Sequence, residues 1–308
     1  MLKKFVFVLL ASIASATSMF AQPLRWSEAK AQSWYAQQPW MVGGNFIPQS
    51  AINELEMWQE ATFDPAEIDR ELGWAEAMGM NVMRVFLHDL LWQQDAPGFQ
   101  RRIDQYLTIA ARHYIKTIFV LFDSCWDPEP RLGPQHPPIP GIHNSGWVQS
   151  PGAKALADRT QYPRLKAYVQ GVVKAFANDN RILAWDVWNE PGADNTFNYP
   201  KTELKHSDRI VLVTALLPQA FEWAREAGAT QPLTSPIWGV EQDKDGSKLP
   251  ELQQIQLRES DIVSFHNYSW PESFRRQVRW LKESNRPVIC TEYMARSVGS
   301  TFDTILPI

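Results

Sequence analysis

One stretch decides the fold: residues 181–192 read RILAWDVWNEPG. The stretch begins as an apolar and aromatic run that is typical of a buried strand. It ends in an amide, a carboxylate and a proline at Asn189, Glu190 and Pro191. A carboxylate at the end of a buried strand is costly unless it is paired or used in chemistry. The rest of the chain must therefore supply its partners.

Apolar runs of the same kind recur along the chain, and amphipathic stretches separate them. Near-continuous apolar runs are typical of parallel strands that helices cover, and spacings of three and four residues predict the helices. An aspartate, proline and glutamate at residues 64–67 predict a helix start, and Gly79 predicts its end. The other predicted strands are 41–46, 81–87, 116–122, 231–238, 261–268 and 286–293, and the other predicted helices are 97–114, 162–178, 208–228, 250–260 and 273–285.

Strands that alternate with helices predict an α/β fold with a parallel sheet. Seven strand signals over about 250 residues favour a (β/α)8 TIM barrel over an open doubly wound sheet. No glycine-rich phosphate loop follows the first strand, which weakens a dinucleotide-binding fold. Only 16 residues follow Glu292, whereas another strand and helix need about 30. We therefore expect the barrel to be truncated before its eighth strand and helix.

The N-terminus has the pattern of a secretory signal peptide. Two lysines precede an apolar stretch and small residues, and cleavage fits after Ala21 or Ala16. A retained N-terminal anchor is the alternative. We expect residues 1–21 to be the signal peptide and 22–308 the catalytic domain of an exported protein, periplasmic or extracellular. No later stretch is apolar enough to span a membrane.

Composition excludes some partners. The net charge is −4 and no basic block occurs, so nucleic acid is not an expected partner. Fourteen tryptophans are many, and flat aromatic rings suit sugar rings as well as protein cores. We expect a monomer without a cofactor. The two cysteines, Cys125 and Cys290, fall on opposite sides of the predicted barrel, so we expect free thiols.

Polar and aromatic side chains gather at the predicted strand ends, which is where parallel barrels build their active sites. Two of them are carboxylates, on the fourth and seventh strands. A pair at about 5–5.5 Å suits retaining glycoside hydrolysis. The candidate catalytic residues are Glu190 and Glu292, and the candidate binding or supporting residues are Arg84, His88, Asp123, Trp126, Asn189, Trp238, His266 and Tyr268.

The two carboxylates need different surroundings, because one must donate a proton and the other must stay ionised. Arg84 near Glu292 would keep that carboxylate ionised, and the Tyr268 hydroxyl would hold it in place. A drier neighbourhood, with Trp188 close by, would favour the protonated form of Glu190.

Three motifs carry a family resemblance: WDVWNEP at 185–191, SFHNY at 264–268 and VICTEY at 288–293. Together they resemble clan A of the glycoside hydrolases, and most closely the cellulase-like enzymes around family 5. The resemblance implies that Glu190 is the general acid/base, that Glu292 is the nucleophile and that Asn189 binds the sugar 2-hydroxyl. Arg84, His266 and Tyr268 match the family's arginine on strand two and His-x-Tyr on strand six. The family's aromatic residue at the end of strand eight falls beyond this sequence.

Several of these residues also have structural readings. Arg84 pairs with Asp186 beneath the site in one reading and orients Glu292 in the other, and both readings can hold. In the structural reading, His88 and His266 are histidines of the core, and Asp123 caps a loop. Trp126, Trp147, Trp238 and Trp270 are candidate sugar platforms.

The leading interpretation is a retaining β-glycosidase that acts on a β-linked oligo- or polysaccharide of the cellulose, mannan or xylan kind. A non-catalytic carbohydrate-binding barrel is the first alternative. A metal-dependent barrel hydrolase is the second, although the first strand offers no His-x-His. Loop differences set the sugar and linkage among such barrels, so we expect the long loop over 123–153 and residues 192–207 to shape the cleft.

Overall fold

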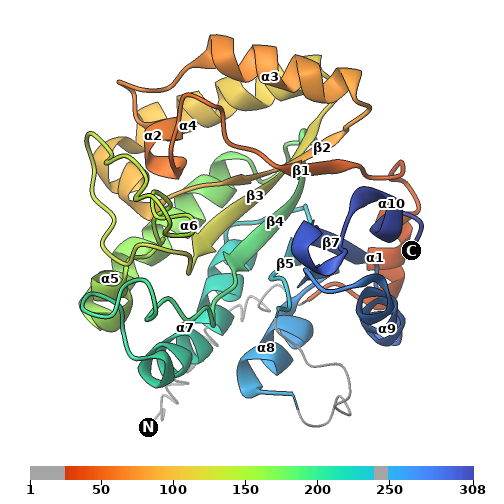
Figure 1. The fold of residues 1–308 in the computed structure, drawn as a ribbon. Helices are drawn as coiled ribbons and strands as arrows, with labels where there is room; N and C mark the ends of the chain where they lie inside the picture. The colour runs from red at the N-terminus through yellow and green to blue at the C-terminus, as the bar shows by residue number, and fades with distance from the viewer. Residues whose placement is uncertain (1–24, 239–248) are drawn as a thin grey trace, which may run out of the picture.

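Parallel strands surrounded by helices make up the protein in a computed structural model, which describes residues 25–238 and 249–308 (Figure 1). The predicted signal peptide at 1–21 lies outside the described residues. The strands are β1 (Gly43–Asn45), β2 (Val82–Phe86), β3 (Lys116–Asp123), β4 (Ile182–Asn189), β5 (Leu233–Thr234), β6 (Val263–Asn267) and β7 (Val288–Tyr293).

The strands pair in chain order, and every ladder is parallel. β1 to β5 form one sheet, and β6 pairs with β7. Among the described residues, a single parallel bridge between Ile237 and Phe265 joins the two groups. β7 comes back close to β1, but no ladder joins them and no eighth strand occurs within 25–238 and 249–308. The α/β barrel class that the sequence predicts is confirmed, with seven strands among the described residues.

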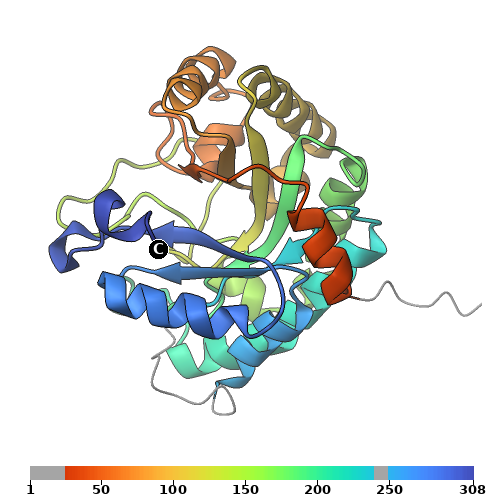
Figure 2. The ribbon, with the colours of Figure 1, turned by 90° about the vertical axis from the view of Figure 1, so that its right-hand side faces the viewer.

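Helices cover the outer face of the strands, as the apolar runs predict. α9 packs along β6 and β7 (Figure 2). None of the helices in the described ranges has both the length and the apolar character to cross a bilayer. The helices are α1 (Glu28–Tyr35), α2 (Glu54–Trp58), α3 (Pro65–Ala77), α4 (Asp89–Arg112), α5 (Ala153–Ala157), α6 (Tyr162–Ala175), α7 (His206–Glu226), α8 (Glu251–Glu259), α9 (Pro271–Lys282) and α10 (Phe302–Ile305).

Two helix starts test the capping and proline signals of the sequence. Asp64 caps α3 as predicted, because its side chain accepts the backbone N–H groups of Ala66 and Glu67. α4 consists of two helical parts that meet at Asp95, whose backbone is not helical. The Asp95 side chain accepts the backbone N–H of Gly98 at 2.9 Å, so the second part begins close to the predicted start at residue 97. Pro97 lies in the first turn of that part, where a proline is tolerated. The first part, from Asp89, is not predicted by the pattern.

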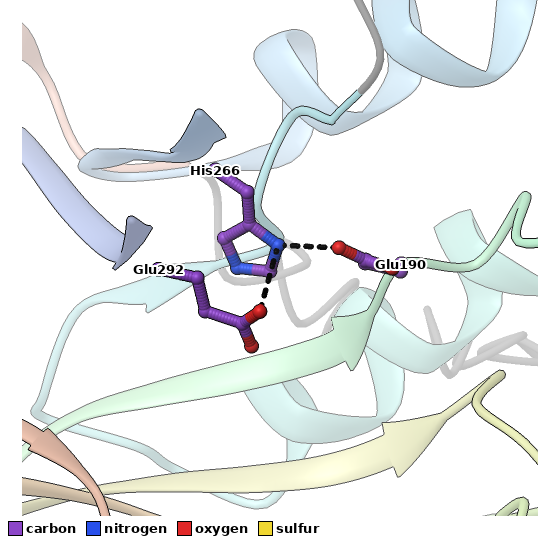
Figure 3. Close-up of side chains that lie close together, drawn as sticks. All are labelled: Glu190, His266 and Glu292. Carbon is purple, nitrogen blue, oxygen red and sulfur yellow. Dashed lines mark hydrogen bonds and ion pairs between the residues drawn. The ribbon is translucent and has the colours of Figure 1, made fainter. Parts of the chain in front are cut away.

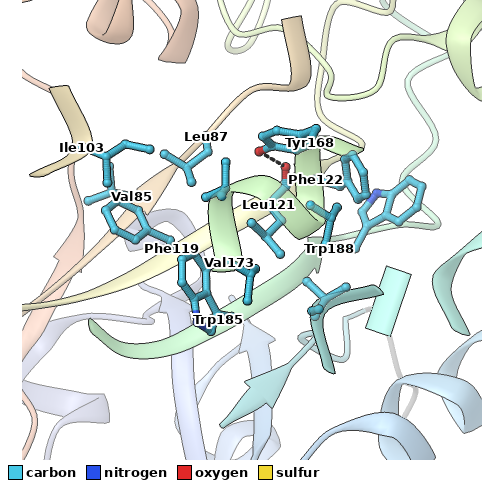
Figure 4. Close-up of a cluster of buried hydrophobic side chains, with 14 of the residues drawn as sticks. Val85, Leu87, Ile103, Phe119, Leu121, Phe122, Tyr168, Val173, Trp185 and Trp188 are labelled. Carbon is cyan, nitrogen blue, oxygen red and sulfur yellow. Dashed lines mark hydrogen bonds between the residues drawn. The ribbon is translucent and has the colours of Figure 1, made fainter. Parts of the chain in front are cut away.

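The main core lies between the sheet and the covering helices. Phe119 and Trp185 from neighbouring strands pack at 5.8 Å between ring centroids, next to Val173 of α6 (Figure 4). Tyr168 of the same helix buries its hydroxyl by donating to the carbonyl oxygen of Leu121 at 2.8 Å. This layer holds β3 and β4 at the centre of the sheet.

A smaller apolar cluster closes the barrel interior at the beginnings of the strands. Trp26, just before α1, and Ala31 of α1 pack there with Ile118, Ala184 and Ile262. Because apolar side chains fill that end, the polar residues of the interior lie toward the carboxyl ends of the strands.

The long loop after β3 is held by buried polar contacts. Arg209 of α7 lies 2.5 Å from Glu203, and both side chains are 1% exposed. The same guanidinium donates to the side-chain oxygen of Gln149 in the loop at 2.7 Å. A buried cation with two acceptors ties the loop to the segment after β4.

We expect Phe119→Ala to lower the free energy of unfolding by about 3–5 kcal/mol, because it leaves a cavity between three aromatic rings. Chemical denaturation followed by tryptophan fluorescence measures the change. Val211→Ala on α7 is the matched control, since that side chain is 68% exposed, and it should change stability by less than about 0.5 kcal/mol. Equal losses for both variants would contradict this placement of the core.

Candidate active site

Three pairs of residues in strand register build the site. Asn45 of β1 lies opposite Arg84 of β2, and Asp123 of β3 lies opposite Asn189 of β4. His266 of β6 lies opposite Glu292 of β7. The β6–β7 register shifts between Phe265 and His266, where Thr291 has no partner. Such an irregularity re-aims a side chain, and here it sets Glu292 level with the histidine.

Strong donors surround the carboxylate of Glu292. Arg84 donates to Oε1 at 2.7 Å and Asn45 to the same oxygen at 3.0 Å, while the Tyr268 hydroxyl donates to Oε2. Burial acts to raise the pKa of Glu292. The charges of His266 and Arg84 and the hydrogen bonds from Tyr268 and Asn45 outweigh it and lower the pKa to about 2. Glu292 is therefore ionised at neutral pH.

Glu190 has weaker partners. Its Oε1 lies 2.7 Å from Nδ1 of His266, and its Oε2 lies 3.5 Å from Sγ of Cys125. Figure 3 shows the His266 ring between the two carboxylates, and its Nδ1 is 3.6 Å from Oε2 of Glu292. One carboxylate oxygen from each glutamate and a nitrogen of His266 all lie within 4.8 Å of one another.

Arg84 serves both of the roles considered from sequence. Its Nη2 donates to Asp186 at 2.6 Å and to Oδ1 of Asn189 at 2.7 Å, while Nη1 reaches Glu292. Because Arg84 occupies the amide oxygen of Asn189, the amide nitrogen faces the other way, and it donates to Asp123 at 2.8 Å. The orientation of the Asn189 amide is thus set from both ends.

Asp123 does more than cap a loop. It accepts hydrogen bonds from Asn189, from Nε1 of Trp147 at 2.7 Å and from the backbone N–H of Cys125. Burial raises the pKa of Asp123 to about 7, although these three donors act in the opposite direction. Asp123 therefore links the long loop to the amide beside Glu190.

His88 does not join this cluster. The side chain is fully buried, its Nδ1 accepts the backbone N–H of Leu90 at the start of α4, and its Nε2 lies 3.0 Å from the carbonyl oxygen of Gln149. Burial lowers the pKa of His88. One ring nitrogen caps α4 and the other contacts the loop, so this histidine matches the structural reading rather than a binding role.

The candidate platforms differ in exposure. Trp238 is 40% exposed and, together with Glu190, lines a hollow of about 700 Å³. Trp147 packs edge-on against Phe86 and is fixed by Asp123. Trp126 is half-buried, with its ring edge-on to His143, and Trp270 caps α9. Of the four, Trp238 combines an exposed ring with a hollow that also contains Glu190.

Two contact residues were not expected from the sequence. Asn45 is a polar residue at the end of its strand, like the other site residues, and this position in the sequence is a signal for a site residue. Cys125 carries no such signal, because it follows β3 in an irregular segment. Both cysteines are free, which confirms the prediction that they are not joined.

Two acidic side chains that face each other at the carboxyl ends of barrel strands define the class of the protein as a glycoside hydrolase. The profile of the cellulase family (glycosyl hydrolase family 5) matches residues 139–304. The chain belongs to this family, as the motifs indicate, and it is an enzyme that hydrolyses glycosidic bonds.

Solved structures share the fold at low sequence identity. An endo-1,4-beta-mannanase from Rhizomucor miehei is 17% identical with a TM-score of 0.58, over 84% of this chain and 79% of that one. A beta-1,4-D-mannanase from Cryptopygus antarcticus is 14% identical with a TM-score of 0.53, over 83% and 76%. An exo-beta-1,4-mannosidase from Opitutaceae bacterium strain TAV5 is 17% identical with a TM-score of 0.55, over 87% and 49%. Among curated proteins no sequence matches.

We expect Tyr268→Phe to raise the pKa of Glu292 above its value of about 2, by up to about one unit, because the carboxylate loses one donor. NMR titration of the side-chain carboxyl carbons measures the change, and Glu292→Gln assigns the signal. Tyr35→Phe on α1 removes a hydroxyl of similar exposure far from the site and should leave the titration unchanged. An unaltered pKa in Tyr268→Phe would contradict the contact.

Proposed function

We propose that the enzyme is a retaining β-glycosidase that uses Glu190 as general acid/base and Glu292 as nucleophile. The observation that carries this proposal is the approach of the two carboxylates to within 4.8 Å between oxygens. Retaining enzymes hold their carboxyl groups about 5–5.5 Å apart, whereas inverting enzymes leave about 6.5–9.5 Å for a water molecule.

The surroundings of Glu292 and Glu190 suit the nucleophile and the acid/base, respectively. Glu292 accepts from a guanidinium, an amide and a phenol, which favours an ionised carboxylate that is ready to attack the anomeric carbon. Among the described residues, no lysine or arginine forms an ion pair with Glu190. Its ion-pair partner is instead the imidazole of His266, at 2.7 Å from Oε1, so Glu190 lacks the guanidinium that supports the charge of Glu292.

The reaction then follows in two displacements. In the first, an oxygen of Glu292 bonds to the anomeric carbon while the glycosidic bond breaks, and Glu190 gives its proton to the leaving oxygen. In the second, Glu190 takes a proton from water as the water oxygen displaces Glu292. The free N–H of the Asn189 amide is available to the sugar 2-hydroxyl, because its other N–H is held by Asp123.

A β-linked glycan is the proposed substrate of an exported enzyme. The export rests on the signal-peptide pattern at 1–21. The similar solved structures named above are described as acting on β-1,4-mannosides, so mannan heads the panel of candidates. Cellulose, xylan and mixed-linkage glucan follow, since loops around a shared barrel select the sugar.

We expect oligosaccharide release from at least one of these four polysaccharides, measured by product sizing. Glu292→Gln should abolish turnover, and Glu190→Gln should slow it about 10²–10⁴-fold. The loss for Glu190→Gln should be smaller on a nitrophenyl glycoside, whose leaving group needs little protonation. Glu272→Gln on α9, 54% exposed, is the control and should retain full activity.

The stereochemistry separates the alternatives. Proton NMR during hydrolysis should show the β-anomer as the first product, and the α-anomer first would contradict the retaining mechanism. Binding of these glycans without release of any product would favour a carbohydrate-binding barrel without catalysis.

A metal-dependent hydrolase is the second candidate, because Glu190, His266 and Glu292 gather three donors within 4.8 Å. The guanidinium of Arg84 lies 2.7 Å from Glu292, and a buried cation at that distance repels a divalent ion. Dialysis against EDTA should therefore leave the hydrolysis rate unchanged. A loss of activity that zinc or another divalent ion restores would contradict the two-carboxylate mechanism.

A further inference from the structure

The segment Asp123–Ser124–Cys125 lies against the chain that carries Glu190. The backbone N–H of Ser124 donates to the carbonyl oxygen of Asn189 at 3.2 Å. The Ser124 hydroxyl accepts from Nε1 of Trp188 at 3.0 Å and donates to the carbonyl oxygen of Pro191 at 3.2 Å. Contacts on both sides of Glu190 thus come from one short segment.

The backbone of Glu190 depends on such support. Its φ is +41°, in the left-handed region that a residue with a side chain rarely adopts. A conformation of this kind costs about 1–3 kcal/mol and persists only where the surroundings determine it. The segment that follows β3 provides those surroundings, and it ends at the thiol beside the Glu190 carboxyl.

The thiol is in its protonated form. Burial raises the pKa of Cys125 well above its ordinary value, and the nearby charges of Asp123, Glu190 and Glu292 raise it further. A side chain that is 5% exposed, with Sγ 3.5 Å from Oε2 of Glu190, has this carboxylate as an acceptor for its S–H.

We propose that Cys125 is a positioning residue for the acid/base Glu190, holding Oε2 through a weak S–H···O hydrogen bond. The inference rests on the proposed function of Glu190. A donor to the ionised carboxylate stabilises that form, and an S–H does so less than an O–H. The thiol therefore orients the carboxyl while it leaves the protonated form accessible. A hydroxyl in its place would favour the ionised form.

Other groups also act on Glu190 and stay constant in this test. Those that face it or act on it through their charge are Asp123 of β3, His266 of β6, Tyr268 just after β6 and Glu292 of β7, with Arg84 of β2 next to Glu292. Substitution at Cys125 changes none of their side chains. A shift in the pH dependence that follows the donor strength at residue 125 is then attributable to this contact.

The test compares Cys125→Ala and Cys125→Ser in the full chain by the pH profile of kcat/KM. The alkaline limb reports the loss of the proton from the general acid. We expect its midpoint to move up in Cys125→Ala, which removes the donor, and down in Cys125→Ser, which strengthens it, each by a few tenths of a pH unit to about one unit. Cys290→Ala is the matched control and should keep the midpoint. Coincident midpoints or the reverse order would overturn the proposal, since lost packing alone lowers the rate equally at all pH values.

An infrared measurement tests the contact without activity. The S–H stretching band of Cys125 is isolated as the difference between the native protein and Cys125→Ala. It should move to lower frequency as pH rises and Glu190 ionises, and it should not respond to pH in Glu190→Gln. A band in the native protein that is independent of pH would overturn the proposal. If no glycan is hydrolysed, the proposed function fails, and this titration still decides whether the thiol binds Glu190.

Discussion

The guanidinium of Arg84 is the constraint on which fold and site both depend. It is 3% exposed inside the barrel and is paired with Asp186 and Glu292 while it donates to Asn189. Burying three charges together costs several kcal/mol of desolvation for each ion, and only close pairing with every donor used offsets that cost. Removing the cation would leave Asp186, which is fully buried, without a counter-charge. The strands must therefore keep the register that brings these groups together.

The register of the parallel strands places the partners of Arg84 where this pairing requires them. Parallel pairing sets Asn45 level with Arg84, and Asp123 level with Asn189. An irregular step at Thr291 of β7 brings Glu292 level with His266. Without that step the alternation of side chains would aim residue 292 away from the interior, because a slip by one residue reverses the face of a strand. The site is therefore a property of the ladder as much as of its motifs.

Sequence patterns predict the part of this arrangement that strands determine. The apolar runs locate β2, β3, β4, β6 and β7, and the polar residues at their ends include both carboxylates, Arg84 and Asn189. The same reasoning misses the first part of α4, before Asp95, and gives His88 a possible binding role, although the His88 side chain is buried under the loop. Contacts made by irregular segments have no periodic signal. Cys125 meets Glu190 only because the segment after β3 folds back against β4, and spacing along the chain does not encode that path.

The two carboxylates lie close enough to share one histidine, yet the proposed mechanism requires them to behave differently, and the donors around them differ. Glu292 is held by a guanidinium, an amide and a phenol, which are strong donors that favour the charge. Glu190 is held by an imidazole and a thiol. Two like charges at this separation repel each other, so the site depends on the strong donors that keep Glu292 ionised. The barrel therefore distinguishes the two carboxylates through Arg84, which contacts Glu292 and not Glu190.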